Sequence, residues 1–255
     1  MVRIIAIGIA IACGSVSGGG LHDDFVNPPK GYGEVPFWWW TGDALDKERI
    51  AWQLEELAKK GVSGTQVNYS HLRSGGWKTA PVEPEIFSDE WWDVFIFAAK
   101  KSKELGMGIG LSGYTLDWPG RDNLYCKLGI STPETRAWVI EEDHQKGGVH
   151  FLQKDGTYDP LRKGAGQLVI DRFFKPFWDK VPPDCHDALN YFFQDELQLA
   201  DGRFPWCEDF PEEFRKRKGY DIVPKLPLLF GKLREDAEKV RLDYNDVVVA
   251  LTEER

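Results

Sequence analysis

Residues 35–70, VPFWWWTGDALDKERIAWQLEELAKKGVSGTQVNYS, decide the fold because they predict a strand, a helix and a second strand in close succession. The first strand is the aromatic run at 35–40, and the second, at 62–70, is rich in residues that favour β-structure. The helix between them is indicated by an N-cap, an apolar repeat and a terminal glycine, namely Asp46, then Ile50, Leu54 and Leu57, then Gly61. Such a unit predicts a parallel sheet with a right-handed crossover.

The same alternation continues along the chain. Ser88 is placed to cap a helix over 89–105, Gly106 ends it, and residues 107–112 predict a third strand. A β-hairpin is then expected from residues 137–141 and 149–153, followed by a helical segment over 166–180 and a fourth strand over 189–193. Two more helices are expected over 211–218 and about 234–254. We therefore predict an α/β fold of the (β/α)8 TIM-barrel type, present only as its first half: about four parallel strands with helices, plus a small β-hairpin insertion at about 119–157.

The length at first suggests a whole barrel, since 255 residues is the usual size of one. Only 59 residues follow Glu196, however, and their pattern is mostly helical. A strand–helix unit takes about 30 residues, so at most about two more units fit. The chain is therefore better interpreted as half a barrel, whose open sheet edges should associate unless they are covered.

The composition excludes several classes of protein. With 42% hydrophobic and 29% charged residues, the chain can bury a sizeable core and is not expected to be disordered. Its formal net charge of −9 argues against sequence-independent nucleic-acid binding, which needs a basic surface. No apolar run is long enough to span a bilayer. The 11 Trp residues suit either a bulky core or a platform for sugar rings.

The N-terminus has the pattern of a signal peptide. A cationic start, an apolar run at 4–12 and small residues after it predict export of residues 1–18 as a signal, and Cys13 also fits a lipoprotein attachment site. The alternative is a buried first strand. Residues 19–34 are predicted to be a linker, and residues 35–255 the partial barrel domain. The protein is accordingly expected to be secreted or periplasmic.

The cysteines indicate no metal centre. Cys13, Cys126, Cys185 and Cys207 include no CxxC spacing, which argues against a zinc site. A disulfide between Cys185 and Cys207 is an open alternative that no pattern in the sequence supports.

The sharpest functional pattern is the end of the fourth strand, where an apolar run stops at Gln194, Asp195 and Glu196. In parallel α/β folds the carboxyl ends of the strands carry the site. A carboxyl beside aromatic walls holds its proton near neutral pH, as a general acid for a glycosidic oxygen must. We predict Glu196 as that acid and Asp195 as a substrate-binding or supporting residue. The alternative is that both are solvated acids.

Further candidate substrate-binding residues follow the first three strands: Trp40, Asn68, Tyr69, His71, Tyr114 and Trp118. Asn and His side chains suit sugar hydroxyls, and indole faces suit pyranose rings. Since Trp38, Trp39 and Trp40 are consecutive, at least one should face the helices and one the barrel axis or cleft. Core packing, a capped turn or a loop anchor would equally explain these residues.

Several segments together resemble one enzyme family. PFWWWTGDALDKERIAWQLEELAKKGVSGTQVNYSH, FSDEWWDVFIFAAKKSKELGMGIGLSGY, LNYFFQDELQL, DFPEEFRKRKGYDIVPKLPLL and RLDYNDVVVALTEER are similar to the barrel domain of the α-L-rhamnosidase-like glycoside hydrolases, family 106 and its relatives. The resemblance covers about residues 34–255. It implies a secreted (β/α)8-barrel enzyme, inverting hydrolysis between two carboxylic acids, a catalytic acid that corresponds to Glu196, and often a bound calcium.

The family also differs from this chain in ways that bear on activity. Its members are usually several times longer, and their general base lies on a later strand that is not found here. A self-sufficient rhamnosidase is therefore not expected from residues 1–255.

Three functional hypotheses remain open. The first is a glycoside hydrolase of plant or microbial oligo- or polysaccharide, in which this chain is the N-terminal part of a longer enzyme and the second carboxylate lies elsewhere. The second is a non-catalytic sugar-binding or degenerate barrel. The third is a metal-dependent sugar isomerase or lyase, with Asp195, Glu196 and His71 around a divalent cation.

Overall fold

The parallel sheet predicted from the sequence is present. The computed structural model describes residues 20–28, 31–40, 44–69, 83–112, 124–145, 148–193, 203–231 and 235–255. Four parallel strands form one sheet in the order β1–β2–β3–β6, with bounds β1 (Phe37–Trp40), β2 (Gly64–Tyr69), β3 (Gly108–Ser112) and β6 (Leu189–Phe193). The strands follow one another in space in chain order, so each helical crossover joins neighbours, as expected of a barrel-type α/β unit.

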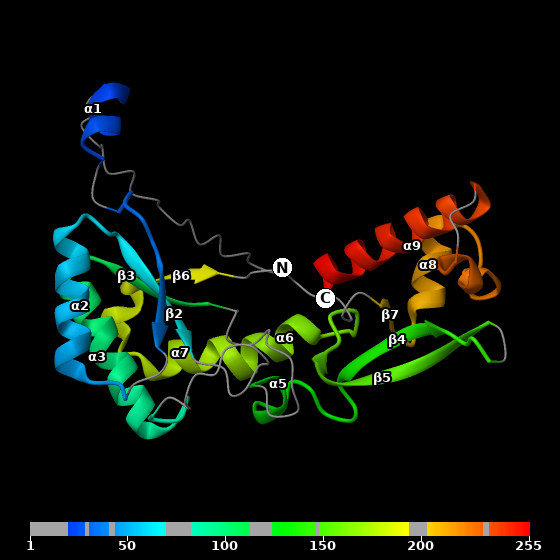
Figure 1. Ribbon diagram of the computed structural model, residues 1–255, viewed down its shortest axis with the longest axis horizontal. Helices are drawn as coiled ribbons and strands as arrows, with labels where there is room; N and C mark the ends of the chain where they lie inside the picture. Colours follow the sequence, from blue (N-terminus) through cyan, green and yellow to red (C-terminus); the bar gives the residue numbers. More distant parts are fainter. Residues whose placement is uncertain are drawn as a thin grey trace, which may run out of the picture.

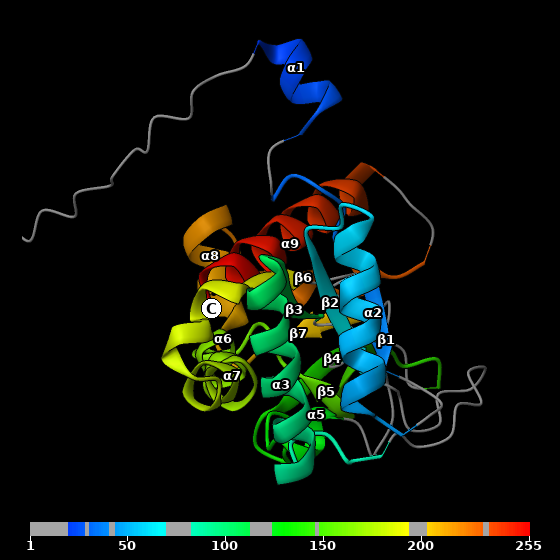
Figure 2. The ribbon, with the colours of Figure 1, turned by 90° about the vertical axis from the view of Figure 1, so that its left-hand side faces the viewer.

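Helices cover one face of this sheet, with α2 (Lys47–Lys59) and α3 (Asp89–Leu105) side by side in front of it in Figure 2. Both N-caps were predicted from the sequence. The carboxylate of Asp46 accepts a hydrogen bond from the Arg49 backbone N–H at 2.8 Å, and Ser88 Oγ accepts one from Trp91 N–H at 3.1 Å. Helix α3 ends at Gly106, whose φ of 66° is left-handed and suits glycine.

An aromatic core joins α3 to the next helical segment. That segment consists of α6 (Ala165–Val169), a π-helical stretch η1 (Ile170–Phe174) and α7 (Lys175–Lys180). The ring centroid of Phe177 on α7 lies 5.0 Å from that of Trp92 and 5.1 Å from that of Phe95 on α3. Aromatic pairs at these separations add to the burial of their apolar surface, so they hold α7 against α3.

The parallel sheet is strongly curled, with its concave face turned away from α2 and α3. Tyr191 on β6 reaches past β3 to Gly64 on β2, where a Cβ atom would lie only 2.1 Å from the Tyr191 ring. Phe37 on β1 and Phe193 on β6 belong to opposite edge strands, yet their ring centroids are 4.8 Å apart. In a flat sheet, edge strands three spacings apart would be separated by about 14 Å.

A second, antiparallel sheet forms the other end of the molecule (Figure 1). Its order is β5–β4–β7, with β4 (Arg136–Glu142), β5 (Val149–Tyr158) and β7 (Phe204–Trp206). The predicted hairpin is thus confirmed as β4 and β5, whereas β7 was not predicted. This sheet has its own core, formed with α8 (Phe210–Lys218), the 3-10 segment η4 (Val223–Leu229) and α9 (Glu235–Glu254).

The two C-terminal helices therefore do not lie behind the fourth parallel strand. Phe210 and Tyr244, from α8 and α9, are 5.1 Å apart by ring centroid and pack with Trp206 of β7. The reason is that β7 supplies a third strand to the hairpin, which gives its apolar face enough surface to bury two helices.

The remaining elements are short. Helix α1 (Leu21–Val26) lies in the predicted linker and buries no residue, and Asp23 and Asp24 occupy its first turn, where acids suit the helix dipole. The other two are α5 (Leu124–Lys127) and the 3-10 segment η2 (Pro183–Ala188). None of the helices in the described ranges is long and apolar enough to cross a bilayer.

The disulfide considered from the sequence does not form. Cys185 and Cys207 are both free thiols, and each is buried in a different core, Cys185 beside the parallel sheet and Cys207 beside the antiparallel sheet. The predicted signal peptide, with Cys13, lies outside the described residues.

Candidate functional site

The four parallel strands bring their carboxyl ends to one edge of the sheet. Trp40 at the end of β1 pairs with Tyr69 at the end of β2, and Ser112 at the end of β3 pairs with Phe193 at the end of β6. The segments that were predicted to carry chemistry continue directly from these positions in the sequence. This edge is the candidate active site.

Most of the predicted site residues lie outside the described residues. They are Glu196, Asp195, His71, Tyr114 and Trp118, and of Tyr69 only the backbone is described. Their roles stay predictions. Trp40 and Asn68 are the two predicted site residues whose side chains can be placed.

Trp40 lies on the helix side of the sheet. Its side chain is 3% exposed, and its ring centroid is 6.0 Å from that of Trp91 and 6.2 Å from that of Phe95, both on α3. Trp38 faces the same side, where its indole N–H donates to Gln53 on α2 at 3.0 Å. Trp40 thus packs against the helices in this structure, and its contact with a sugar stays a prediction.

Trp39 occupies the opposite face and was not selected from the sequence. It is 41% exposed and lies 6.4 Å, ring to ring, from Phe37 on the concave face. Successive side chains of a strand lie on opposite faces of the sheet, so the middle one of three consecutive tryptophans is predicted to face away from the other two. This prediction is confirmed. The sequence could not show which side is the helix side, because all three residues are equally apolar.

Asn68 lies on the concave face, where its register partner on β1 is Trp39. Its side chain is fully buried, and its Oδ1 has no hydrogen-bond partner within the described part of the chain. The same holds for Oε1 of Gln66, two residues earlier on the same face. A buried acceptor without a donor costs about 1–3 kcal/mol, so both oxygens are suited to receive hydroxyl or N–H donors.

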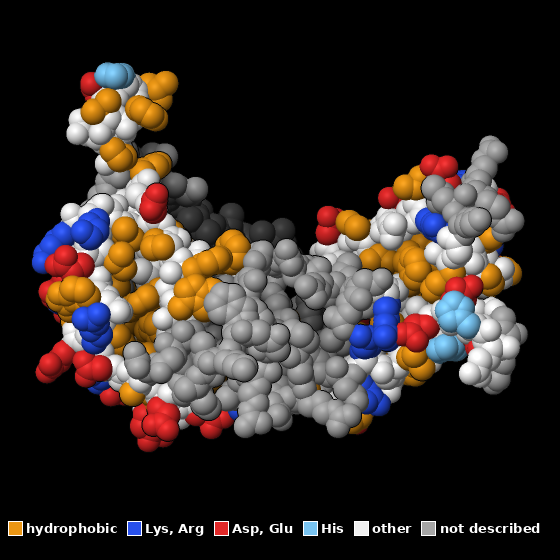
Figure 3. Space-filling model, viewed as in Figure 1, with side chains coloured by type: hydrophobic (Ala, Val, Ile, Leu, Met, Phe, Trp, Pro, Cys, Tyr) orange, Lys and Arg blue, Asp and Glu red, His pale blue; other side chains and the backbone are white. Residues whose placement is uncertain are grey.

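The concave face thus combines aromatic rings with two unpaired amide oxygens. Phe37, Trp39, Tyr191 and Phe193 supply the rings, and hydrophobic side chains are visible over this part of the molecule in Figure 3. Apolar ring faces next to hydrogen-bonding groups are the combination that carbohydrate sites use.

No metal centre emerges from the part of the chain that the structure describes. In the described ranges, no group of three or more His, Cys, Asp or Glu side chains could hold an ion. The described residues thus contain no ligand set for the calcium that the resemblance implies.

A charged cluster lies beside the antiparallel sheet, where the C-terminal residue Arg255 donates to both oxygens of Asp209, at 3.0 and 2.9 Å. Burial alone would raise the pKa of Asp209, but hydrogen bonds from Arg255 and Lys163 outweigh it and hold that pKa well below its usual range. Nearby, burial raises the pKa of Asp159 to about 6, against the opposing effect of a hydrogen bond from the Leu161 backbone. One carboxyl is thus held ionised, and the other protonates near neutral pH.

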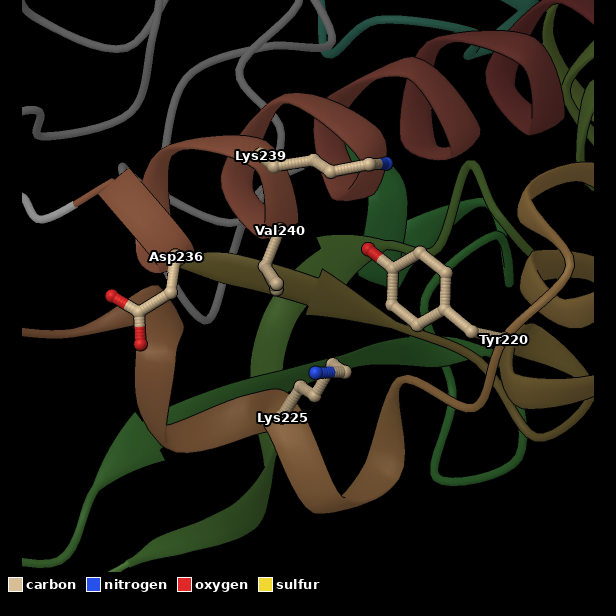
Figure 4. A pocket seen from close by; sticks show the side chains of 5 residues that line it. All are labelled: Tyr220, Lys225, Asp236, Lys239 and Val240. Atoms are coloured by element: carbon tan, nitrogen blue, oxygen red, sulfur yellow. The ribbon is translucent and has the colours of Figure 1, made fainter.

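A pocket of about 700 Å³ is lined by Tyr220, Lys225, Asp236, Lys239 and Val240, at the far end of the same core (Figure 4). The Tyr220 ring is flanked by the two lysines, whose Nζ atoms are 5.7 and 5.3 Å from its centroid, while the Asp236 carboxylate points away from it. The Tyr220 hydroxyl donates to Asp243 at 2.8 Å, and Lys239 pairs with the same carboxylate. The polar groups of this pocket mainly form hydrogen bonds and ion pairs with one another, so they do not indicate which ligand the pocket would bind.

Comparison with known families identifies the class to which part of the chain is related. A model of glycoside hydrolase family 106, described as alpha-L-rhamnosidase, matches residues 157–254, so this part of the chain is glycoside hydrolase-like. The match includes β6, the segment with Glu196, and both C-terminal helices. The resemblance predicted from the sequence is thereby confirmed over this range.

Solved structures that match the chain are also glycosidases. They include a rhamnosidase from Novosphingobium sp. PP1Y, with 21% identity over 49% of this chain and 11% of that chain, at a TM-score of 0.34. A beta-galactosidase from Halorubrum lacusprofundi is 15% identical over 87% of this chain and 35% of that chain, with a TM-score of 0.41. A beta-galactosidase from Marinomonas ef1 is 12% identical over 86% of this chain and 34% of that chain, with a TM-score of 0.46.

All three TM-scores lie below 0.5, so the family model, and not structural likeness, indicates the relationship. The chain spans about a third or less of the length of each of these proteins. Among curated proteins, none matches the chain.

Proposed function

We propose that this chain carries the first half of the catalytic (β/α)8 barrel of a glycoside hydrolase, with Glu196 as its general acid. The observation that carries the proposal is the match of the rhamnosidase family model to residues 157–254, a range that contains Glu196. Glu196 also follows β6 by three residues, on the carboxyl side of a parallel strand. Active sites of α/β barrels lie on that side.

The curvature of the parallel sheet supports the barrel. A closed barrel needs helices outside and a concave inner face, and β1, β2, β3 and β6 curl away from α2 and α3 so that Tyr191 lies over Gly64. In this proposal the linker at 19–34 precedes a domain at 35–255, with an insertion at about 119–157. The proposal requires further barrel strands that residues 35–255 do not supply.

The proposed reaction is hydrolysis of a glycosidic bond in an oligo- or polysaccharide. Glu196 donates its proton to the leaving oxygen, and a water activated by a second carboxylate attacks the anomeric carbon. That second carboxylate lies outside this chain. The two carboxyl groups would be roughly 6.5–9.5 Å apart for inversion and about 5–5.5 Å apart for retention. The unpaired oxygens of Asn68 and Gln66 are suited to accept sugar hydroxyls.

The test is a comparison of Glu196→Gln with the matched control Glu90→Gln, an exposed acid on α3, in the product of the complete reading frame. On a rhamnoside with a poor leaving group, Glu196→Gln should lower kcat at least about 100-fold, because general-acid catalysis contributes about 100- to 10,000-fold. On a nitrophenyl rhamnoside, whose leaving group needs no proton, the loss should be much smaller. Full activity of Glu196→Gln on both substrates would overturn the role of Glu196.

Export through residues 1–18 is part of the proposal, since the substrate is a polysaccharide outside the cell. Expression in a bacterial host, followed by mass spectrometry of the exported protein, should find the new N-terminus near residue 18. Full-length protein retained in the cytoplasm would contradict export.

A further inference from the structure

A groove of about 690 Å³ lies beside the antiparallel sheet, away from the carboxyl edge of the parallel strands. Three segments line it: the start of β4, the loop at 159–163, and residues 207–215 at the start of α8. These segments come from well-separated parts of the sequence, and the groove exists only because β7 joins the hairpin and brings α8 next to β4.

Trp138 of β4 supplies an aromatic platform in this groove. Its side chain is 38% exposed, although its strand neighbours Ala137 and Val139 are buried. In the described ranges, no other aromatic ring stacks on it. A large exposed indole that lines a cavity is suited to pack against an apolar ligand face such as that of a pyranose.

The polar groups around Trp138 include vacant donors and acceptors. Arg162 Nε is buried and has no hydrogen-bond partner among the residues that the structure describes. Glu208 and Glu212 make neither a hydrogen bond nor an ion pair within the same residues, whereas Asp209 is already held by Lys163 and Arg255. A buried hydrogen-bond donor that lacks an acceptor is unfavourable, and a bound ligand would supply the missing acceptor.

The charges in the groove are nearly balanced. Five acidic and four basic side chains line it, so it offers no strong net field for an anion or a cation. Interspersed donors and acceptors instead match hydroxyl groups, each of which both donates and accepts a hydrogen bond.

We infer that this groove binds a neutral pyranose sugar, with its apolar face on Trp138 and its hydroxyls between Arg162 and Glu212. The site goes beyond the proposed hydrolytic function, because it needs neither Glu196 nor turnover. It would hold a carbohydrate chain on the second sheet independently of cleavage.

The test is titration of the 255-residue chain, carrying Glu196→Gln, with methyl α-L-rhamnopyranoside, methyl α-D-glucopyranoside and methyl β-D-galactopyranoside. D-Galacturonate serves as the charged probe. Calorimetry and saturation-transfer NMR should find at least one neutral pyranoside bound, with a Kd of about 1 mM or lower. Trp138→Ala and, separately, Glu212→Ala should weaken that binding at least 10-fold.

The matched control is Trp52→Ala, which removes another half-exposed tryptophan, on α2. It should leave the Kd unchanged. Glu212 is exposed, so its variant tests the groove even if Trp138→Ala fails to fold. The inference is overturned if no neutral pyranoside binds, if galacturonate binds more tightly than all three, or if Glu212→Ala leaves the Kd unchanged. Failure of Glu196→Gln to impair hydrolysis would bear on the proposed function alone.

Discussion

At the scale of single residues, Asp159 is the clearest case of a carboxyl whose charge opposes folding. It is 4% exposed and its Oδ1 accepts the Leu161 backbone N–H at 2.9 Å, with Arg162 and Arg255 as the nearby cations. Burial raises its pKa from 3.8 to about 6. A carboxyl whose pKa is raised by folding stabilises the native state below pH 3.8, and that contribution is lost as pH rises through 6.

Asp159→Asn should therefore stabilise the protein at neutral pH. The amide copies the protonated carboxyl and keeps an oxygen for the Leu161 N–H, so the gain should be small at pH 4 and about 3 kcal/mol at pH 7. Urea unfolding at a series of pH values measures this difference. A pH-independent effect of Asp159→Asn would contradict the pKa shift.

The contact between Gly64 and the Tyr191 ring follows from the curl of the parallel sheet, so substitutions at these two residues test that curl. A methyl group at this position would lie 2.1 Å from Cε2 of Tyr191, so Gly64→Ala should destabilise the protein by about 1–3 kcal/mol. In a Tyr191→Ala background the same change should cost less, since the ring is gone and only the Gly108 carbonyl oxygen, 2.9 Å from the added Cβ, still crowds it. A double-mutant cycle by chemical denaturation measures the coupling, and additive effects would mean that the ring does not lie on Gly64.

At the scale of elements, the helices begin where local chemistry dictates. The bounds of α3 agree with the sequence prediction at both ends, because Ser88 caps its first turn and Gly106 adopts a left-handed conformation at its end. Helix α2 likewise starts after Asp46. Caps act through contacts within a few residues, so a sequence reveals them without knowledge of the fold.

Asp46→Ala should lower the free energy of unfolding by about 1 kcal/mol, because the Arg49 N–H loses its acceptor. Asp46→Asn should retain most of the stability, since asparagine is an equally good N-cap. Thermal unfolding followed by circular dichroism compares the two. Equal losses in both variants would show that the carboxylate acts through its charge and not through the cap hydrogen bond.

At the scale of the whole molecule, the residues that the structure describes form two hydrophobic cores, which share no residue. One lies between the parallel sheet and α2, α3 and α7, and the other between the antiparallel sheet and α8 and α9. A contact between their elements is the hydrogen bond from Gly166 N–H on α6 to the carbonyl oxygen of Arg255. Cores with so little in common are expected to unfold in separate steps.

Leu54→Ala and Leu251→Ala form a matched pair for this expectation, since both side chains are fully buried and each belongs to one core. Each should cost about 2–5 kcal/mol. In scanning calorimetry, Leu54→Ala should lower the melting temperature of one transition and Leu251→Ala that of the other. A single transition that shifts equally in both variants would show one cooperative unit.

The parallel strands, the capped helices, the β4–β5 hairpin and the family resemblance now confirmed over residues 157–254 could all be predicted from the amino-acid sequence. They follow from periodicity, caps and motifs, which are local. Long-range contacts were needed to show that Trp39 and not Trp40 faces the concave side, that β7 completes a second sheet, and that α8 and α9 pack there. Three consecutive tryptophans are chemically equivalent, so their orientation is set only when a helix covers one face of the strand. A strand of only three residues, such as β7, is stable only where the edge of another strand is already present to pair with it.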